Sequence, residues 1–394
     1  MGSAALERKI AKRALEVTRS PFQVIAEYAR SLKLKDAIFL NVGEPDFTTP
    51  KHIIEAAKRA LDEGFTHYSA DRGFPELRQA IAEKLHKERG IDVNPADEVI
   101  VTAGGAEANW VTLMALVNPG DEVLIPSPYY PPFSIVVHLA GGVPVPVPLR
   151  EELGFAWDPE DVKRKVTTKT KILLVNSPNN PTGGVLDEEC IKALAETAQE
   201  HDLIVVSDEV YEAFIYDGKK AHSIASIPGM EERTIVTNSF SKTYAMTGWR
   251  VGFAAGRSEF ISQMLKVHYA TAICASAIAQ RAAIAALTGP QDCVREMTAE
   301  YDRRRQIIVD GLNKIPGFKC AMPKGAFYVF PNIKEFRMPS EDFAKFLVKE
   351  ARVVTVNGSA FGPDGEGYLR ISYAASAEDI KEALERIKEA TERL

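Results

Sequence analysis

Two side chains in this sequence could perform chemistry that most residues cannot. Lys242 lies in SFSKTYAM among small and apolar residues, a setting that lowers the pKa of a lysine and makes its amine nucleophilic enough to form a Schiff base. Asp208 follows the apolar run LIVV, where a carboxylate is costly unless a cation or a hydrogen-bond donor faces it. Taken singly, the lysine could be a solvated surface residue and the aspartate a helix N-cap.

Two more motifs could bind a ligand. The turn Gly104-Gly105-Ala106 follows VIVT and opens a helical stretch, whose free N–H groups suit a phosphate. The GxGxxG and Walker A spacings are both absent, so this turn could equally be a plain strand-to-helix connection. NSPNNPTG (176–183) follows KILLV and offers the amide of Asn180, although a simple turn would look the same.

These motifs share one position, because each comes directly after a short apolar run. From about 99 to 256 such runs alternate with helical periodicity, which predicts βαβ units and a mostly parallel sheet. Several runs are apolar throughout, as strands covered on both faces are. The expected strands are VIVT (99–102), EVLI (122–125), KILLV (171–175), LIVV (203–206), TIVT (234–237) and VGFA (251–254). Ligands bind beyond the carboxyl ends of such strands, so we expect the motifs to form one site.

The remaining segments have structural roles. The C-terminal third predicts an α+β segment, with strands at 327–330, 353–356 and 368–374. Its last helix places an apolar stripe on one face, formed by Ile380, Leu384, Ile387 and Leu394. VPVPVP (143–148) suits an edge strand or an extended connector. The basic run 303–305 has acidic neighbours and is expected to form a solvated helix face without a function.

Composition excludes several classes of protein. A chain of 394 residues with 45% hydrophobic and 26% charged residues is globular, and its length predicts two domains. The net charge of −6 argues against nucleic acid and membrane partners. Four cysteines without a CxxC pair and seven scattered histidines indicate neither a disulfide scaffold nor a metal site. No secretory or membrane-spanning segment is evident, so we expect a cytoplasmic protein.

Together the motifs resemble the class I and II aminotransferases, the fold type I enzymes that use pyridoxal 5′-phosphate. The resemblance covers nearly the whole chain and is closest to a subgroup with many bacterial and archaeal aspartate and aromatic aminotransferases. It implies an α/β fold, with a large domain of 46–284 and a small α+β domain of 1–45 and 285–394. The motifs that carry it are NVGEPDF, HYSADRGFPELR, AGGAEAN, PSPYYPPF, NSPNNPTG, SDEVYEAF, SFSKTYAMTGWRVG and GYLRISYA.

The resemblance implies a role for each residue around the cofactor ring. Lys242 is expected to form the Schiff base and then move a proton between the substrate α-carbon and the cofactor. Asp208 would pair with the protonated pyridine nitrogen. Tyr211 and Asn180 would hydrogen-bond the phenolic oxygen, and Tyr130 would stack on the ring.

The phosphate would be held by amides, hydroxyls and cations, contributed by Gly104, Gly105, Ala106, Ser239, Ser241 and Arg250. Ala106 departs from the many relatives that carry a hydroxyl residue there. Tyr68 is expected to reach the phosphate of a partner subunit, which implies a homodimer with shared sites.

Substrate contacts follow from the same resemblance. Arg370 would bind the α-carboxylate through a bidentate fork, assisted by Asn180 and the backbone of Gly43. The arginine with which one aspartate-specific subgroup binds the distal carboxylate has no matching position. Arg72 is our candidate for that partner from across the dimer interface, although a solvated turn arginine is the alternative.

The expected reaction is ping-pong transfer of an amino group from an L-amino acid, aspartate, aromatic or other, to a 2-oxo acid, with 2-oxoglutarate the expected acceptor. A C–S lyase that performs β-elimination on the same scaffold is one alternative, because lysine, aspartate and arginine serve both reactions. A ligand-sensing regulator without turnover is the other.

Overall fold

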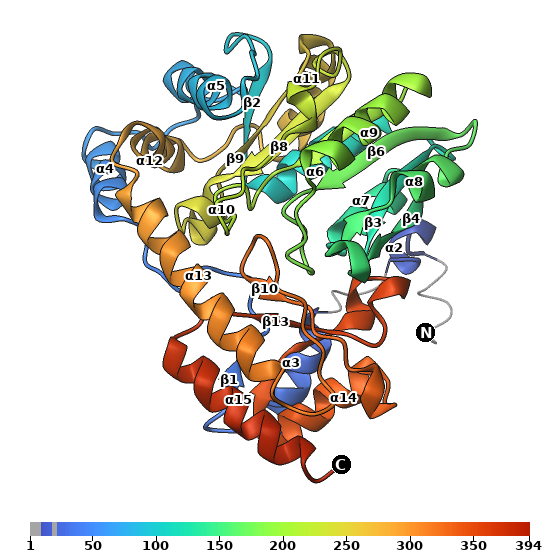
Figure 1. Cartoon of the computed structure of the whole chain (residues 1–394). Coiled ribbons are helices and arrows are strands. Elements are labelled where there is room, and N and C mark those ends of the chain that lie inside the picture. Colours follow the sequence, from blue (N-terminus) through green and yellow to red (C-terminus); the bar gives the residue numbers. More distant parts are fainter. Residues whose placement is uncertain (1–8, 18–21) are drawn as a thin grey trace.

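The computed structural model describes residues 9–17 and 22–394 (Figure 1). Its centre is an eight-stranded sheet in the order β2-β9-β8-β7-β6-β3-β4-β5. The strands are β2 (Val99–Thr102), β3 (Glu122–Ser127), β4 (Val143–Arg150), β5 (Ala156–Trp157), β6 (Thr170–Asn176), β7 (Ile204–Asp208), β8 (Thr234–Ser239) and β9 (Gly252–Ala255). Every strand expected between 99 and 256 is present, and the α/β fold class is confirmed by the sheet and its flanking helices.

Most of this sheet is parallel. Strands β4, β3, β6, β7 and β8 pair in parallel, whereas β9 is antiparallel to both neighbours and β5 is antiparallel to β4. β5 pairs only with Leu149 and Arg150 of β4. The proline-rich part of β4, 143–148, therefore forms an edge, where a missing N–H costs no ladder bond.

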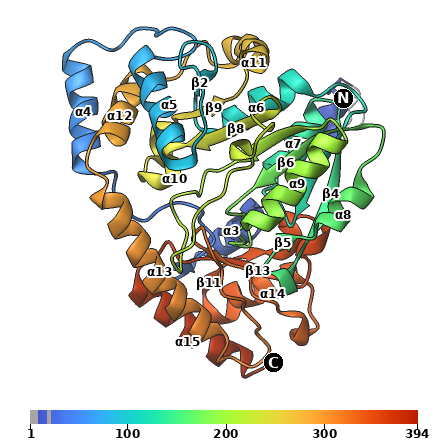
Figure 2. The ribbon, with the colours of Figure 1, turned by 45° about the horizontal axis from the view of Figure 1, so that its top comes forward.

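Helices cover both faces of the sheet because alternate residues of each strand point to opposite sides. Ile172 and Leu174 pack into a cluster with α6 and α7, whereas Leu173 and Val175 pack into one with α9. One face carries α6 (Gly105–Leu116), α7 (Pro132–Leu139) and α11 (Ser258–Thr271). The other carries α5 (Pro75–Arg89), α8 (Pro159–Lys165), α9 (Glu188–Glu200) and α12 (Ala277–Thr288), with α4 (Lys51–Asp62) packed on α12 (Figure 2).

A second layer of elements lies below the large sheet in Figure 1. It is built around a sheet in the order β10-β13-β12 and a separate parallel pair, β1-β11. Its elements are α3 (Phe22–Ser31), β1 (Ile38–Phe39), α13 (Asp292–Leu312), β10 (Tyr328–Val329), α14 (Ser340–Phe346), β11 (Val353–Val354), β12 (Val356–Asn357), β13 (Leu369–Ser372) and α15 (Ala377–Thr391). The N-terminal α3 and β1 thus pack with the C-terminal third. The domain boundaries near residues 45 and 285 stay a prediction.

Shorter helical segments complete the described chain: α2 (Lys12–Leu15), α10 (Phe240–Thr243), 3₁₀ turns at Glu151–Leu153, Ile224–Ser226, Thr247–Trp249, Lys334–Phe336, Gly358–Phe361 and Pro363–Gly365, and a π turn at Leu347–Ala351. None of the described helices is long and apolar enough to cross a membrane.

Two expectations about helix faces were wrong. Arg304 and Arg305, in the basic run of α13, are only 6% and 2% exposed, and only Arg303 is solvated. Each buried guanidinium is paired, Arg304 with Asp46 and Glu300, and Arg305 with aspartates, so the burial of charge is compensated. Leu394 does not join the apolar stripe of α15, because it lies beyond the end of that helix and is 60% exposed.

Candidate active site

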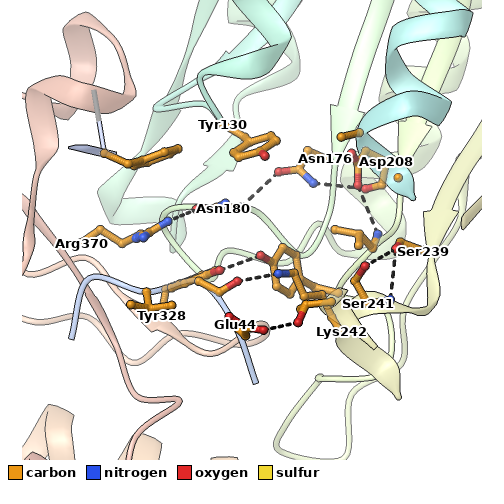
Figure 3. A pocket seen from close by; sticks show the side chains of 18 of the residues that line it. Glu44, Tyr130, Asn176, Asn180, Asp208, Ser239, Ser241, Lys242, Tyr328 and Arg370 are labelled. Atoms are coloured by element: carbon orange, nitrogen blue, oxygen red, sulfur yellow. Dashed lines mark hydrogen bonds between the residues drawn. The ribbon is translucent and has the colours of Figure 1, made fainter. Parts of the chain in front are cut away.

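The carboxyl edge of the parallel strands borders a cavity of about 460 Å³ (Figure 3). The pairing of Asn176 with Asp208, and of Asp208 with Thr237, brings the ends of β6, β7 and β8 to one level. Predicted residues that line the cavity are Gly43, Gly105, Ala106, Tyr130, Asn180, Asp208, Tyr211, Ser239, Ser241, Lys242, Arg250 and Arg370. The structure thus brings together residues that the sequence separates by more than 300 positions.

Lys242 enters this cavity from α10, the short helix that Ser239 caps with its side chain. Its Nζ donates to the carbonyl of Gly43 across 2.5 Å. Burial lowers the pKa of Lys242 to about 8, an effect that Glu44 opposes. A fraction of the amine is therefore neutral near pH 7 and can act as a nucleophile or a base.

Asp208 ends β7, and its side chain is buried at the wall of the cavity. Burial raises the pKa of Asp208 to about 6, although hydrogen bonds from Asn109 and from the backbone of Val210 favour the charged form. Asn109 Nδ2 donates to Asp208 Oδ2 across 2.6 Å, and the Val210 amide donates to Oδ1 across 3.2 Å. No lysine, arginine or histidine in the described chain forms an ion pair with Asp208, so its carboxylate suits a cationic atom of a ligand.

Gly105, Ala106, Ser239 and Ser241, here called the anion cup, lie near the point where β2 turns into α6. Gly104 caps α6 with a φ of 88°, a left-handed conformation that a side chain would strain. A Cβ there would also approach Arg250 Nη2 to 2.6 Å. The first amides of α6, at Gly105 and Ala106, have no acceptor within the helix, and both residues line the cavity with Ser239 and Ser241.

The cup is supported from behind by a buried pair. Glu107, in the first turn of α6, accepts a hydrogen bond from the amide of Ala103, which precedes the glycine turn. His268 Nδ1, on α11, lies 2.9 Å from the other oxygen of Glu107, and both side chains are buried. This contact fixes the path of the turn that presents the cup amides.

Arg370 lies on the opposite side of the cavity, on β13 (Figure 3). Its Nη2 donates to the carbonyl of Asn41 across 2.6 Å and its Nη1 to Asn180 Oδ1 across 3.2 Å. The guanidinium carbon lies 4.6 Å from the ring centre of Tyr328 and 5.1 Å from that of Phe22. Nε of Arg370 is buried without a hydrogen-bond partner among the described residues. A guanidinium held in this way suits a carboxylate.

A pair of tyrosine hydroxyls lies between Lys242 and Arg370. Tyr211 Oη and Tyr328 Oη are 2.7 Å apart, and burial raises the pKa of Tyr211 well above its ordinary value. The ring of Tyr130 packs edge-on against Phe133, with 5.5 Å between the ring centres, and borders the upper part of the cavity in Figure 3.

Three predicted residues do not line the cavity of this chain. Gly104 lies behind the cup and shapes it. Tyr68 is 79% exposed, and Arg72 donates through Nη1 to the carbonyl of Asp97 across 2.9 Å. Because both roles were expected across a subunit interface, they stay predictions.

Sequence reasoning missed several residues of the site. Asn109 is inside the AGGAEAN motif, one helical turn after Gly105, and that spacing could have identified it. Tyr328 belongs to the predicted strand 327–330, and no sequence signal separates it from an ordinary strand residue. Phe22 and Arg30, both on α3, line the cavity without any sequence signal that separates them from an ordinary amphipathic helix. No group of three metal-ligating side chains is found among residues 9–17 and 22–394.

Comparison with known proteins places relatives over nearly the whole chain. A family model described as aminotransferase class I and II matches residues 35–387. The aspartate aminotransferase of Pyrococcus abyssi is 50% identical over 357 residues, which cover 90% of this chain and 92% of that protein. Aromatic-amino-acid aminotransferase 2 of Thermococcus litoralis is 47% identical with the same coverage. The solved structure of Thermus thermophilus aspartate aminotransferase with maleate has a TM-score of 0.92 at 40% identity and covers 97% of this chain and 99% of its own.

Proposed function

The chain belongs to the class I and II aminotransferases, and we propose that it moves the amino group of aspartate, an aromatic or another L-amino acid to a 2-oxo acid, with 2-oxoglutarate as the expected acceptor. It is a pyridoxal-phosphate-dependent transaminase. The observation that carries the proposal is the convergence of Lys242, Asp208 and Arg370 on one cavity. The relatives are named aspartate or aromatic aminotransferases and support neither a C–S lyase nor a regulator.

The residues of the cavity fit pyridoxal 5′-phosphate. Asp208, a buried carboxylate without a cation in the described chain, suits the protonated pyridine nitrogen. The cup at Gly105, with Ser239, Ser241 and Arg250, suits the phosphate. When bound, the cofactor supplies an electron sink for the bond that is broken at the substrate α-carbon.

The chain's own groups would perform the remaining steps. Lys242 Nζ, whose pKa burial lowers to about 8, would take the proton from the substrate α-carbon and pass it to the cofactor, and would move a proton in the opposite direction when the 2-oxo acid is converted to its amino acid. Arg370 would hold the α-carboxylate, so that the α-hydrogen faces the lysine. The rings of Phe22 and Tyr328, which pack on Arg370, would exclude water from this contact.

The substrate side chain would lie near aromatic rings and a further cation. Phe22, Tyr130, Phe133 and Arg30 all line the cavity. Rings suit an aromatic substrate, and an arginine suits a second carboxylate. The Thermus thermophilus relative was solved with maleate, a dicarboxylate, which supports an acidic substrate here. Arg72 of a partner subunit is the other candidate for the distal carboxylate.

We also propose a homodimer. Tyr68 exposes 79% of its surface and borders a surface hollow with Phe65 and 274–278, and Tyr269, on the helix before that segment, is 62% exposed. Aromatic residues so exposed favour burial against a second copy. The cytoplasmic location stays a prediction from the sequence.

A panel of amino donors tests the proposed function. The holoenzyme is mixed with one donor and no acceptor, and the 2-oxo acid is quantified. We expect one equivalent per site from aspartate, tyrosine or phenylalanine, and continued turnover only after 2-oxoglutarate is added. Sustained release of ammonia and pyruvate from a sulfur amino acid alone would contradict the proposal and favour the lyase.

A further inference from the structure

Residues 41–49, here called the bridging loop, connect β1 to the segment that enters α4 and carry several contacts of the active site. The carbonyl of Asn41 accepts from Arg370, and that of Gly43 accepts from Lys242, across 2.6 and 2.5 Å. The Glu44 carboxylate accepts from the hydroxyl of Thr247. Within the described chain, residues 41–48 form no backbone–backbone hydrogen bond. Side-chain contacts must therefore hold this loop in place.

The loop is attached at both ends. At its start, the backbone of Leu40 bonds to Val354 and Ser372 across 2.9 and 2.8 Å. At its end, Thr49 donates to the carbonyl of Ala245 across 2.5 Å and accepts from Trp249 across 3.0 Å. These two attachments lie on different layers of the molecule, so the segment between them needs an anchor of its own.

That anchor is Asp46. Both of its oxygens accept from Nη1 of Arg304, across 2.9 and 2.8 Å, and Tyr301 donates to Oδ1 across 3.3 Å. The Arg304 guanidinium also lies over the rings of Phe47 and Tyr301, 5.4 and 5.7 Å from their centres. Both partners belong to α13, a 21-residue helix of the lower layer.

Burial distinguishes this ion pair from those on the surface. The Arg304 side chain is 8% exposed, whereas that of its neighbour Arg303 is 53% exposed and, among the described residues, forms an ion pair with Glu300 alone. Asp46 is 29% exposed, but a charge-assisted bond to a buried guanidinium constrains its partner more strongly than one between two exposed side chains.

The active site tolerates little movement of the bridging loop. A Cβ on Gly43 would lie 2.6 Å from Tyr328 Oη and 3.7 Å from Arg370 Nη1, so the loop backbone packs directly on both groups. A displacement of about 1 Å would loosen the carbonyl contacts to Lys242 and Arg370 together.

We propose that Arg304 is a positioning residue, which through Asp46 fixes the bridging loop and thereby orients Lys242 and Arg370 for the reaction. Arg304 does not line the cavity and touches neither lysine nor carboxylate-binding arginine. This assigns a function to Arg304, one residue of a basic run that the sequence indicated to be a solvated face.

The test compares Arg304→Met with Arg303→Met, which alters the adjacent arginine of the same helix. Two properties are measured: amide hydrogen exchange of 41–49 in the cofactor-free protein, and kcat and KM of the holoenzyme for aspartate and tyrosine. For Arg304→Met we expect exchange in the loop to accelerate and KM to rise roughly tenfold for both donors, with a smaller change in kcat. Arg303→Met should change neither property.

Asp46→Ala provides an independent arm if Arg304→Met folds poorly, because Asp46 is part-exposed. It should reproduce the Arg304→Met effects, and the double variant should be no worse than either single one. Wild-type exchange and KM in Asp46→Ala would overturn the proposal, as would equal effects from Arg303→Met or additive losses in the double variant. If the wild-type protein showed no transamination at all, that result would instead contradict the proposed function.

Discussion

Asn109 Nδ2 donates to Asp208 Oδ2 across 2.6 Å, and the oxygen of the same amide, Asn109 Oδ1, accepts from Thr237 Oγ1 across 2.9 Å. The carboxylate that faces the cavity is thus oriented from α6 and β8, by two residues with neutral side chains. Because Asn109 is a neutral donor, it favours the ionised carboxylate without removing its charge, which remains free to pair with a ligand cation.

Removal of this donor should raise the pKa of Asp208 further. In Asn109→Ala we expect the acid limb of the pH profile of kcat/KM to move to higher pH, with roughly a tenfold loss at pH 6 and less at pH 8. Thr237→Val should act in the same direction but more weakly. An unchanged acid limb in Asn109→Ala would show that the hydrogen bond does not control the ionisation of Asp208.

Asp208 should also make the stability of the cofactor-free protein depend on pH. Burial raises the pKa of Asp208 from 3.8 to about 6, so the folded protein keeps a proton that the unfolded chain loses between about pH 4 and 6. The stability that this proton provides is present below pH 4 and lost as pH rises through 6, at a cost of about 3 kcal/mol.

Asp208→Asn should therefore raise the free energy of unfolding at pH 8, by up to about 3 kcal/mol, and leave it nearly unchanged at pH 4. Urea denaturation of the cofactor-free proteins measures both values. Destabilisation at pH 8 would contradict the account, because it would mean that the carboxylate contributes to folding and not only to binding.

These two residues show what the sequence could and could not predict. Asp208 was found because a strand that is apolar on both faces ends in a carboxylate, which is a local pattern. Asn109 lies on a helix about 100 positions away, and only the pairing of β7 with β8 and the packing of α6 bring it to Asp208. The chain order of the strands was readable, whereas their lateral order depends on tertiary packing.

For Arg304 the sequence pattern predicted a solvated position, and this prediction was wrong. Acidic neighbours along a helix usually indicate a solvated face, and that rule holds for Arg303. The rule fails for Arg304 because its partner Asp46 is 258 positions away, so the sequence alone does not reveal that the charge is compensated inside the protein. The positions of Phe22 and Arg30 at the cavity likewise depend on how α3 packs against the C-terminal third.

Arg370 is expected to recognise what all amino-acid substrates share. Arg370→Lys keeps the charge but loses the planar fork. The loss of transition-state stabilisation, calculated from the ratio of kcat/KM values, should therefore be about 1.5–3 kcal/mol for aspartate and for tyrosine alike. Steady-state kinetics with both donors measures this loss. A selective loss for one donor would mean that Arg370 binds the side chain of the substrate instead of its α-carboxylate.

Substrate side-chain choice should depend on one arginine. In Arg72→Met we expect transition-state stabilisation, calculated from kcat/KM, to fall by about 1.5–3 kcal/mol for aspartate and 2-oxoglutarate. The kcat/KM values of aromatic donors should stay unchanged. Arg30→Met is the matched comparison, because Arg30 lines the cavity of its own chain. If Arg30→Met alone produces the selective loss, the partner is Arg30 and the prediction for Arg72 is wrong.

Lys242 is proposed to perform transamination in this cavity. The most direct test is a single turnover, in which the 2-oxo acid formed from aspartate or tyrosine without acceptor is quantified for wild type, Lys242→Ala and Lys242→Arg. Wild type should form one equivalent per site and then stop until 2-oxoglutarate is added. Neither variant should form the 2-oxo acid at the wild-type rate, although both should retain the native far-UV circular dichroism spectrum. Product formation by Lys242→Ala at the wild-type rate would contradict the account.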